Sequence, residues 1–95
     1  MASLNVSTNE LAIVGNNIVS HGEEFSTLLT EIKAENDRLL DAWKGSDAEK
    51  YASKIEEEAK IMNQLADAIN STGEFLIQIA KAYETARDEA AGAIK

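Results

Sequence analysis

Large apolar residues recur at alternating spacings of three and four along most of the chain, and this pattern constrains the fold more than any other feature. One series runs from Leu11 to Leu39 and a second from Ala48 to Tyr83. The spacing matches 3.6 residues per helical turn, so each segment predicts an amphipathic α-helix with one apolar side. The sequence is therefore expected to fold as an all-α protein.

Helix boundaries are indicated by two capping-box patterns and one glycine. Ser7 followed by Glu10, and Ser46 followed by Glu49, place an N-cap oxygen and a reciprocal carboxylate at each helix start. Gly45 is free to adopt a positive φ just beyond the end of the first helix. We expect one domain, 1–95, with a helix over about 7–42, a turn at 43–46, a second helix over about 47–90 and a frayed tail at 91–95.

So short a connection forces the two helices to run antiparallel, as a helix-turn-helix hairpin. In heptad notation, with Leu11 and Ala48 at position a, folding about Gly45 pairs residues whose numbers sum to 90 and joins a to d each time. The residues expected to pack inside the hairpin or between hairpins are Leu11, Val14, Ile18, Phe25, Leu28, Leu29, Ile32, Leu39, Ile55, Met62, Leu65, Ile69, Leu76 and Ile79.

A row of small residues occupies heptad position e on both helices. Folding about the turn brings Gly15 near Gly73 and Gly22 near Ala66. A glycine inside a helix costs about 1 kcal/mol relative to alanine. Close approach of the two helices is the expected compensation.

More large apolar residues flank the a/d positions than a single two-helix contact can cover. A leftover apolar stripe on a small protein usually marks an interface, and the closed two-fold solution is a pair of hairpins forming a four-helix bundle. The chain is also too short for an extensive core and has no Cys for a disulfide. Dimerisation is therefore expected. The flanking residues are Ile13, Val19, Leu29, Leu40, Phe75 and Ile77.

Composition argues against several classes of function. The 17 acidic and 9 basic residues give a net charge of −8, which disfavours nucleic acid and anionic lipid as partners. No apolar run approaches the roughly 20 residues of a membrane span, and residues 1–7 show no secretory signal peptide. Without Cys, and with one His, a common zinc site is excluded.

Three titratable residues lie on the apolar rows. His21 occupies a d position and is either a packing residue or a pH sensor. Glu35 and Glu58 are expected near each other, as rim residues or as a device that fixes helix register rather than as catalytic carboxylates. No Glu-x-x-His repeat of a di-iron bundle occurs. We expect no enzymatic activity and no cofactor.

The tripeptide Trp43-Lys44-Gly45, near the middle of a chain of about this length between two amphipathic helices, resembles the WXG family of ESAT-like proteins. The resemblance spans nearly the full length. It implies a hairpin with Trp43 at its tip and Gly45 shaping the turn. It also implies a homodimer or a dimer with a paralogue, and export by a type VII secretion system without a cleaved signal peptide. Trp43 would help to form a surface read by the membrane ATPase of that system.

The family also carries a C-terminal export signal, in which an acidic residue follows a tyrosine at the fourth position. Here Tyr83 is followed at that position by Arg87, and the acid comes one residue later, at Asp88. Residues five apart do not share a helix face as residues four apart do. The corresponding signal is either Tyr83 with Asp88, in a degenerate form, or is supplied by a heterodimer partner. Core packing at an a position accounts for Tyr83 equally well.

The leading interpretation is a dimeric secreted effector or co-secreted adaptor. A second is a cytosolic targeting factor that binds the helical head of a larger toxin and delivers it to the secretion system. A third is an unrelated coiled-coil scaffold inside the cell. Export that depends on the secretion ATPase separates the first from the others.

Overall fold

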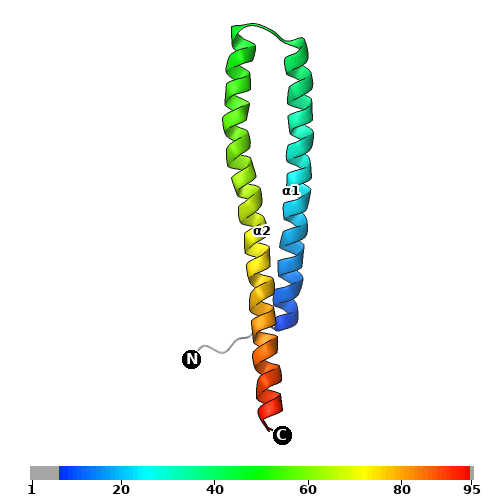
Figure 1. Ribbon diagram of the computed structural model, residues 1–95. Helices are drawn as coiled ribbons and strands as arrows, with labels where there is room; N and C mark the ends of the chain where they lie inside the picture. The colour runs from blue at the N-terminus through cyan, green and yellow to red at the C-terminus, as the bar shows by residue number, and fades with distance from the viewer. Residues whose placement is uncertain (1–6, 95) are drawn as a thin grey trace.

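Two long antiparallel helices joined by a short turn make up the molecule (Figure 1). The computed structural model describes residues 7–94. Helix α1 spans Thr8–Ala42 and helix α2 spans Ser46–Ile94. The hairpin measures 75 × 22 × 18 Å, and the C-terminal end of α2 continues past the start of α1. The expected all-α hairpin is therefore confirmed.

The helix ends differ from the expected ones in two places. Ser7 caps α1, with its Oγ accepting a hydrogen bond of 3.0 Å from the Glu10 N–H, as the sequence predicts. Ser46, by contrast, is the first residue of α2, and the Glu49 N–H donates to the Gly45 carbonyl at 3.1 Å. Helix α2 also continues through 91–94, where a frayed tail was expected.

Small residues line the contact between the two helices. Among the described residues, those that are buried are all glycine or alanine, and most lie on the e rows: Gly15, Gly22, Ala48, Ala66, Gly73 and Ala80. The sequence placed the a and d rows at the centre of this contact, which is wrong for Val14 and Leu28, since their exposed fractions are 43% and 54%. The helices approach more closely along a row of small side chains than along a row of large ones.

The contact is tightest at Gly15 and Gly73, as the sequence predicts. A Cβ added to Gly15 would lie 2.8 Å from the Gly73 carbonyl oxygen, and one added to Gly73 would lie 2.8 Å from the Gly15 carbonyl oxygen. Gly22 packs against α2 as well, where a Cβ would lie 3.2 Å from Cγ2 of Ile69. At this end of the hairpin, the backbones themselves are in contact.

Toward the turn, the e row of α1 changes from glycine to Leu29 and Asn36. These larger side chains face Ala52 and Ala59 of α2, and a groove of about 640 Å³ lies between the helices. Its apolar walls include Leu29, Leu40, Ile55 and Met62, and its polar rim includes Lys33 and Asp37. The two helices are thus in close contact toward the end opposite the turn, which we call the base, and are separated by this groove near the turn, which we call the tip.

This contact predicts opposite effects for two glycine-to-alanine substitutions in α2. Gly73→Ala gains about 1 kcal/mol of helix propensity but forces a backbone contact apart, and overpacking costs about 1–3 kcal/mol. We expect a lower midpoint of thermal unfolding by circular dichroism at fixed protein concentration. Gly92→Ala, with nothing within 4 Å of the added Cβ, is the matched control and should raise the midpoint. Equal midpoints for the two variants would contradict the close contact.

Candidate interaction surface

The tip of the hairpin is fixed by backbone geometry at both ends of the turn. The Trp43 N–H donates to the Leu39 carbonyl at 2.9 Å and closes α1. Lys44 Nζ donates to the Leu40 carbonyl at 3.0 Å. Gly45 has a φ of 118°, a backbone conformation that favours glycine. The Trp-Lys-Gly sequence therefore forms the turn itself.

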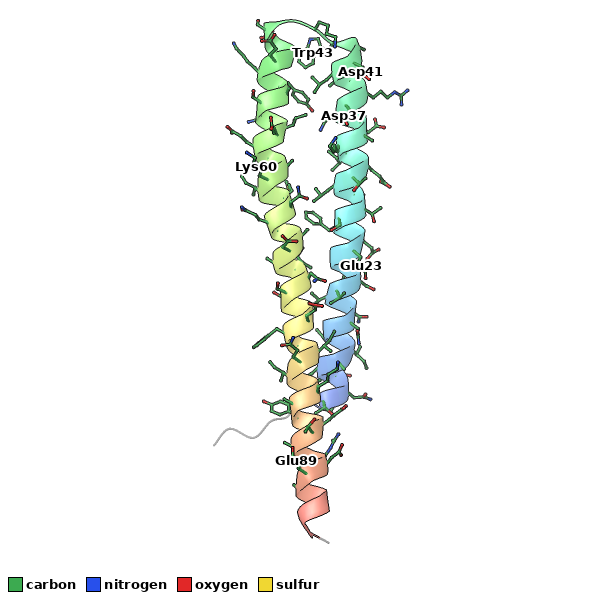
Figure 2. The ribbon with its side chains drawn as sticks, in the orientation of Figure 1. Glu23, Asp37, Asp41, Trp43, Lys60 and Glu89 are labelled. Carbon is green, nitrogen blue, oxygen red and sulfur yellow. The ribbon has the colours of Figure 1, made fainter. Side chains whose placement is uncertain are left out.

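Tyr51 of α2 packs against the tryptophan and is itself hydrogen-bonded to α1. The Trp43 and Tyr51 rings are tilted by 49°, with their centroids 5.7 Å apart, which is within the range of a favourable aromatic pair. Tyr51 Oη donates a hydrogen bond of 2.7 Å to Oδ1 of Asn36, joining α2 to α1 (Figure 2 shows Trp43 between the helix ends). Trp43 remains 37% exposed. The tip presents an anchored but accessible indole.

One side of the hairpin is apolar along most of its length. Because the antiparallel helices meet along their e rows, the a and d rows of both helices turn to the same side. We call this side the apolar face. Its large exposed residues are Val14, Leu28, Ile32, Leu39, Ile61, Met62, Leu65, Phe75 and Tyr83. Exposed apolar surface of this extent on a small hairpin is typical of sites of protein–protein interaction.

The predicted packing residues divide into two groups. Val14, Leu28, Ile32, Leu39, Met62 and Leu65 are exposed on the apolar face. The others are half-buried beside the contact between the two e rows, which we call the seam: Leu11, Ile18, Phe25, Leu29, Ile55, Ile69, Leu76 and Ile79. Sequence reasoning missed Ile61, which is 63% exposed, although its position two heptads before Phe75 indicates the same edge of the face.

The apolar residues that flank the a and d rows also divide into two groups. Val19, Leu29, Leu40 and Ile77 are half-buried beside the seam, where they add to the hairpin's own core. Ile13 is 48% exposed and lies outside the apolar face, although it precedes Val14 in sequence. The stripe expected to drive association is therefore made mainly by a and d residues.

Three titratable residues interrupt the apolar face. His21 Nδ1 lies 3.0 Å from Oε1 of Glu24, and both side chains are 73% exposed. Lys54 Nζ lies 4.0 Å from Oε2 of Glu58, which also lines the groove. Glu35 is exposed. Exposed pairs of this kind contribute little to the stability of the hairpin.

Tyr83 lies at the opposite end of the hairpin from Trp43. It is 38% exposed. Arg87, one turn further along α2, donates from Nη2 to Oγ1 of Thr8 at 3.4 Å and so ties α2 to the start of α1. Asp88 is exposed. The fourth position after Tyr83 thus serves the contact between the helices.

The described residues contain no group of three or more His, Cys, Asp or Glu side chains placed to hold a metal ion. Neither α1 nor α2, over the same residues, has a stretch long and apolar enough to cross a membrane.

A long two-helix hairpin with a Trp-X-Gly turn and one apolar face defines a class of small helical binding proteins. Residues 3–87 match the model of the WXG100 family, described as proteins of 100 residues with WXG. The chain belongs to this family.

A solved structure shares the fold. The crystal structure of a mutant of the secreted protein EsxB from Bacillus anthracis strain Sterne matches with a TM-score of 0.79 and 18% sequence identity, covering 88% of this chain and 97% of that one. No curated protein matches the chain in sequence.

The aromatic tip makes a prediction about stability. Tyr51→Phe removes the hydroxyl that bonds Asn36, and Asn36→Ala removes the acceptor, so each should lower the free energy of unfolding by about 1 kcal/mol. The double variant should cost less than the sum of the two, because the bond is lost only once. Urea denaturation at fixed protein concentration measures all three values. Strict additivity would show that the hydrogen bond contributes nothing.

Proposed function

We propose that this protein is a substrate or co-secreted adaptor of a type VII secretion system and acts as a dimer through its apolar face. Membership of the WXG100 family supports the secretion route. The fold shared with a protein described as secreted agrees with it. The protein would be made in the cytoplasm and exported without a cleaved signal peptide.

The observation that carries this proposal is the apolar face. Nine large apolar side chains, from Val14 to Tyr83, are at least 37% exposed on one side of the described hairpin. Leaving so many in water is unfavourable, since burial stabilises by about 25 cal/mol per Å² of apolar surface. A second hairpin, either another copy or a paralogue, would cover the face and complete a four-helix bundle.

The tip and the base supply the surfaces for recognition by the secretion machine. Trp43 is accessible and held by Tyr51, so it is suited to contact the membrane ATPase. Tyr83, with Asp88, is the matching candidate at the base. Arg87 at the position of the usual acid is occupied with Thr8, so Asp88 is the carboxylate left to this signal.

A second candidate role is delivery rather than export. In that case the apolar face would bind the helical head of a larger toxin, and the protein would stay in the cytoplasm. The groove near the tip favours this role as well as the first, because its apolar walls can accept side chains from any helical partner.

Export provides the test. The tagged protein should be found in the culture supernatant of its native host, and deletion of the secretion ATPase should retain it in the cells. Trp43→Ala should reduce export at least about tenfold while leaving helix content unchanged, because the variant loses a recognition group and keeps both helices. Ile13→Ala is the matched control, since Ile13 is exposed but lies off the tip and the apolar face.

Retention of the wild-type protein in cells while a larger partner is exported would favour the delivery role. Normal export in the absence of the ATPase would overturn the secretion proposal altogether. Equal export of the two variants would remove Trp43 from the recognition surface.

A further inference from the structure

The polar residues that interrupt the apolar face are spaced so that they can meet across a two-fold axis. On α1, the d row reads Val14, His21, Leu28, Glu35, and on α2 the polar d positions are Glu58 and Thr72. Each is exposed in the isolated hairpin. The proposed dimer would cover them all, and a covered polar group must find a partner.

Two face-to-face arrangements close with two-fold symmetry. In one, the hairpins lie head to tail, so that α1 packs on α1 of the second copy and α2 on its α2. In the other, the tips are together and α1 packs on α2. In both, the packed helices are antiparallel, and each side chain at position a or d enters a hole formed by four residues of the facing helix. Residues at position a then lie opposite residues at position d.

The head-to-tail arrangement satisfies the polar residues. Centring the α1 pair between Phe25 and Leu28 puts His21 opposite Ile32 of the second copy. The hole that His21 then enters is bounded by Leu28, Glu31, Ile32 and Glu35 of the second copy. The imidazole is thereby placed between two carboxylates, in addition to its own Glu24 at 3.0 Å.

The same axis also satisfies α2. The hairpin brings Gly15 to Gly73 and Gly22 to Ile69, pairs whose numbers sum to 88 and 91. Residues of α1 and α2 whose numbers sum to about 90 therefore lie at the same level of the hairpin. An axis that passes α1 between Phe25 and Leu28 then passes α2 between Met62 and Leu65. When α2 packs on α2 of the second copy about this centre, Glu58 enters a hole that includes Thr72 of the second copy. The Thr72 hydroxyl can donate a hydrogen bond to the Glu58 carboxylate.

With the tips together, the polar residues clash. Glu58 would enter the hole formed by Leu28, Glu31, Ile32 and Glu35 of the second copy, which places it against two further carboxylates. His21 would face Leu65, Ala68, Ile69 and Thr72, where it finds no acid. Like charges side by side in a closing interface are unfavourable. The charge pattern therefore favours the head-to-tail dimer centred between Phe25 and Leu28 over the arrangement with the tips together.

We infer that His21 of each copy pairs with Glu35 of the other in a head-to-tail homodimer, and that this pair makes dimerisation tighten as the pH falls below neutral. The inference rests on the proposed dimer. Histidine gains a proton near pH 6.5 and glutamate near pH 4.3. The pair carries both charges only when the imidazole is protonated and the carboxylate is ionised, so it is strongest in mildly acidic solution and weakens as the pH rises.

The other groups facing His21 are carboxylates and uncharged side chains, with one cation further away. On its own helix, Glu24 is in contact with it. On α2, the residues level with it on the apolar face are Leu65, Ile69 and Thr72, which carry no charge. From the second copy it would meet Glu31 and Glu35, with Arg38 one turn beyond Glu35. In the proposed dimer, three carboxylates would thus surround the imidazole of His21.

The test is a charge exchange measured by the dimer dissociation constant, from sedimentation equilibrium, at about pH 5.5 and about pH 8. Wild-type protein should dimerise about tenfold more tightly at the lower pH. His21→Glu should weaken the dimer at both values, and Glu35→His should weaken it most at the lower pH. The double exchange H21E/E35H should restore wild-type affinity at the lower pH to within about threefold, because the pair is re-formed in the opposite sense.

Glu23→His is the control for general loss of negative charge, because Glu23 lies on α1 away from the apolar face. It should leave the pH dependence intact. All substituted side chains are exposed in the hairpin, so circular dichroism should show unchanged helix content. A dimer in which H21E/E35H is weakened by the sum of its two single effects would overturn the pairing while leaving the dimer in place. A wild-type chain that stays monomeric at both pH values would instead overturn the dimer proposed above, and the pairing with it.

Discussion

The contact between Gly15 and Gly73 determines how the rest of the hairpin is arranged. With no side chains at these positions, the backbones of α1 and α2 approach until a Cβ on either residue would lie 2.8 Å from a carbonyl oxygen. Alanines at 66 and 80 extend the same close contact along α2. Because the small e rows fill the space between the helices, the large a and d side chains have no room there. They turn to one side and form the apolar face.

This arrangement separates the functions of the chain in space. The tip carries the accessible Trp43, the base carries Tyr83, and the apolar face runs between them. The hairpin is stabilised by the seam, whereas association uses surface that the seam leaves uncovered. A substitution on the apolar face can therefore alter association without unfolding the hairpin, and this property makes the proposed dimer accessible to mutation.

Much of this structure follows from the sequence. The three-and-four spacing of apolar residues predicts both helices, and the single interruption at Trp43-Lys44-Gly45 predicts the turn. Periodicity does not decide which row lies inside. The a/d and e rows have the same repeat and differ by less than half a turn, so the closer approach allowed by glycine decides it. The pairing of Gly15 with Gly73 in the sequence indicates that the e rows form the contact between the helices. This places Val14 and Leu28 outside that contact.

Other features depend on contacts that no local pattern encodes. The hydrogen bond from Tyr51 to Asn36 joins two helices, and its partners lie 15 residues apart. Arg87 donates a hydrogen bond to Thr8, 79 residues away in the chain. Ser46 fits a capping box in sequence, yet the Gly45 carbonyl accepts the N–H of Glu49, because the positive φ of Gly45 already directs the chain into α2.

The solution mass of the purified protein, measured by light scattering after size-exclusion chromatography, tests whether the apolar face is covered by a second copy. The chain has a mass of 10.3 kDa. Wild-type protein and Ile13→Glu should both give twice that mass, whereas Leu28→Glu, which places a charge in the middle of the apolar face, should give the mass of one chain with its helix content unchanged. A wild-type mass of one chain at every concentration, or a dimer that Leu28→Glu leaves intact, would contradict the assignment of this face.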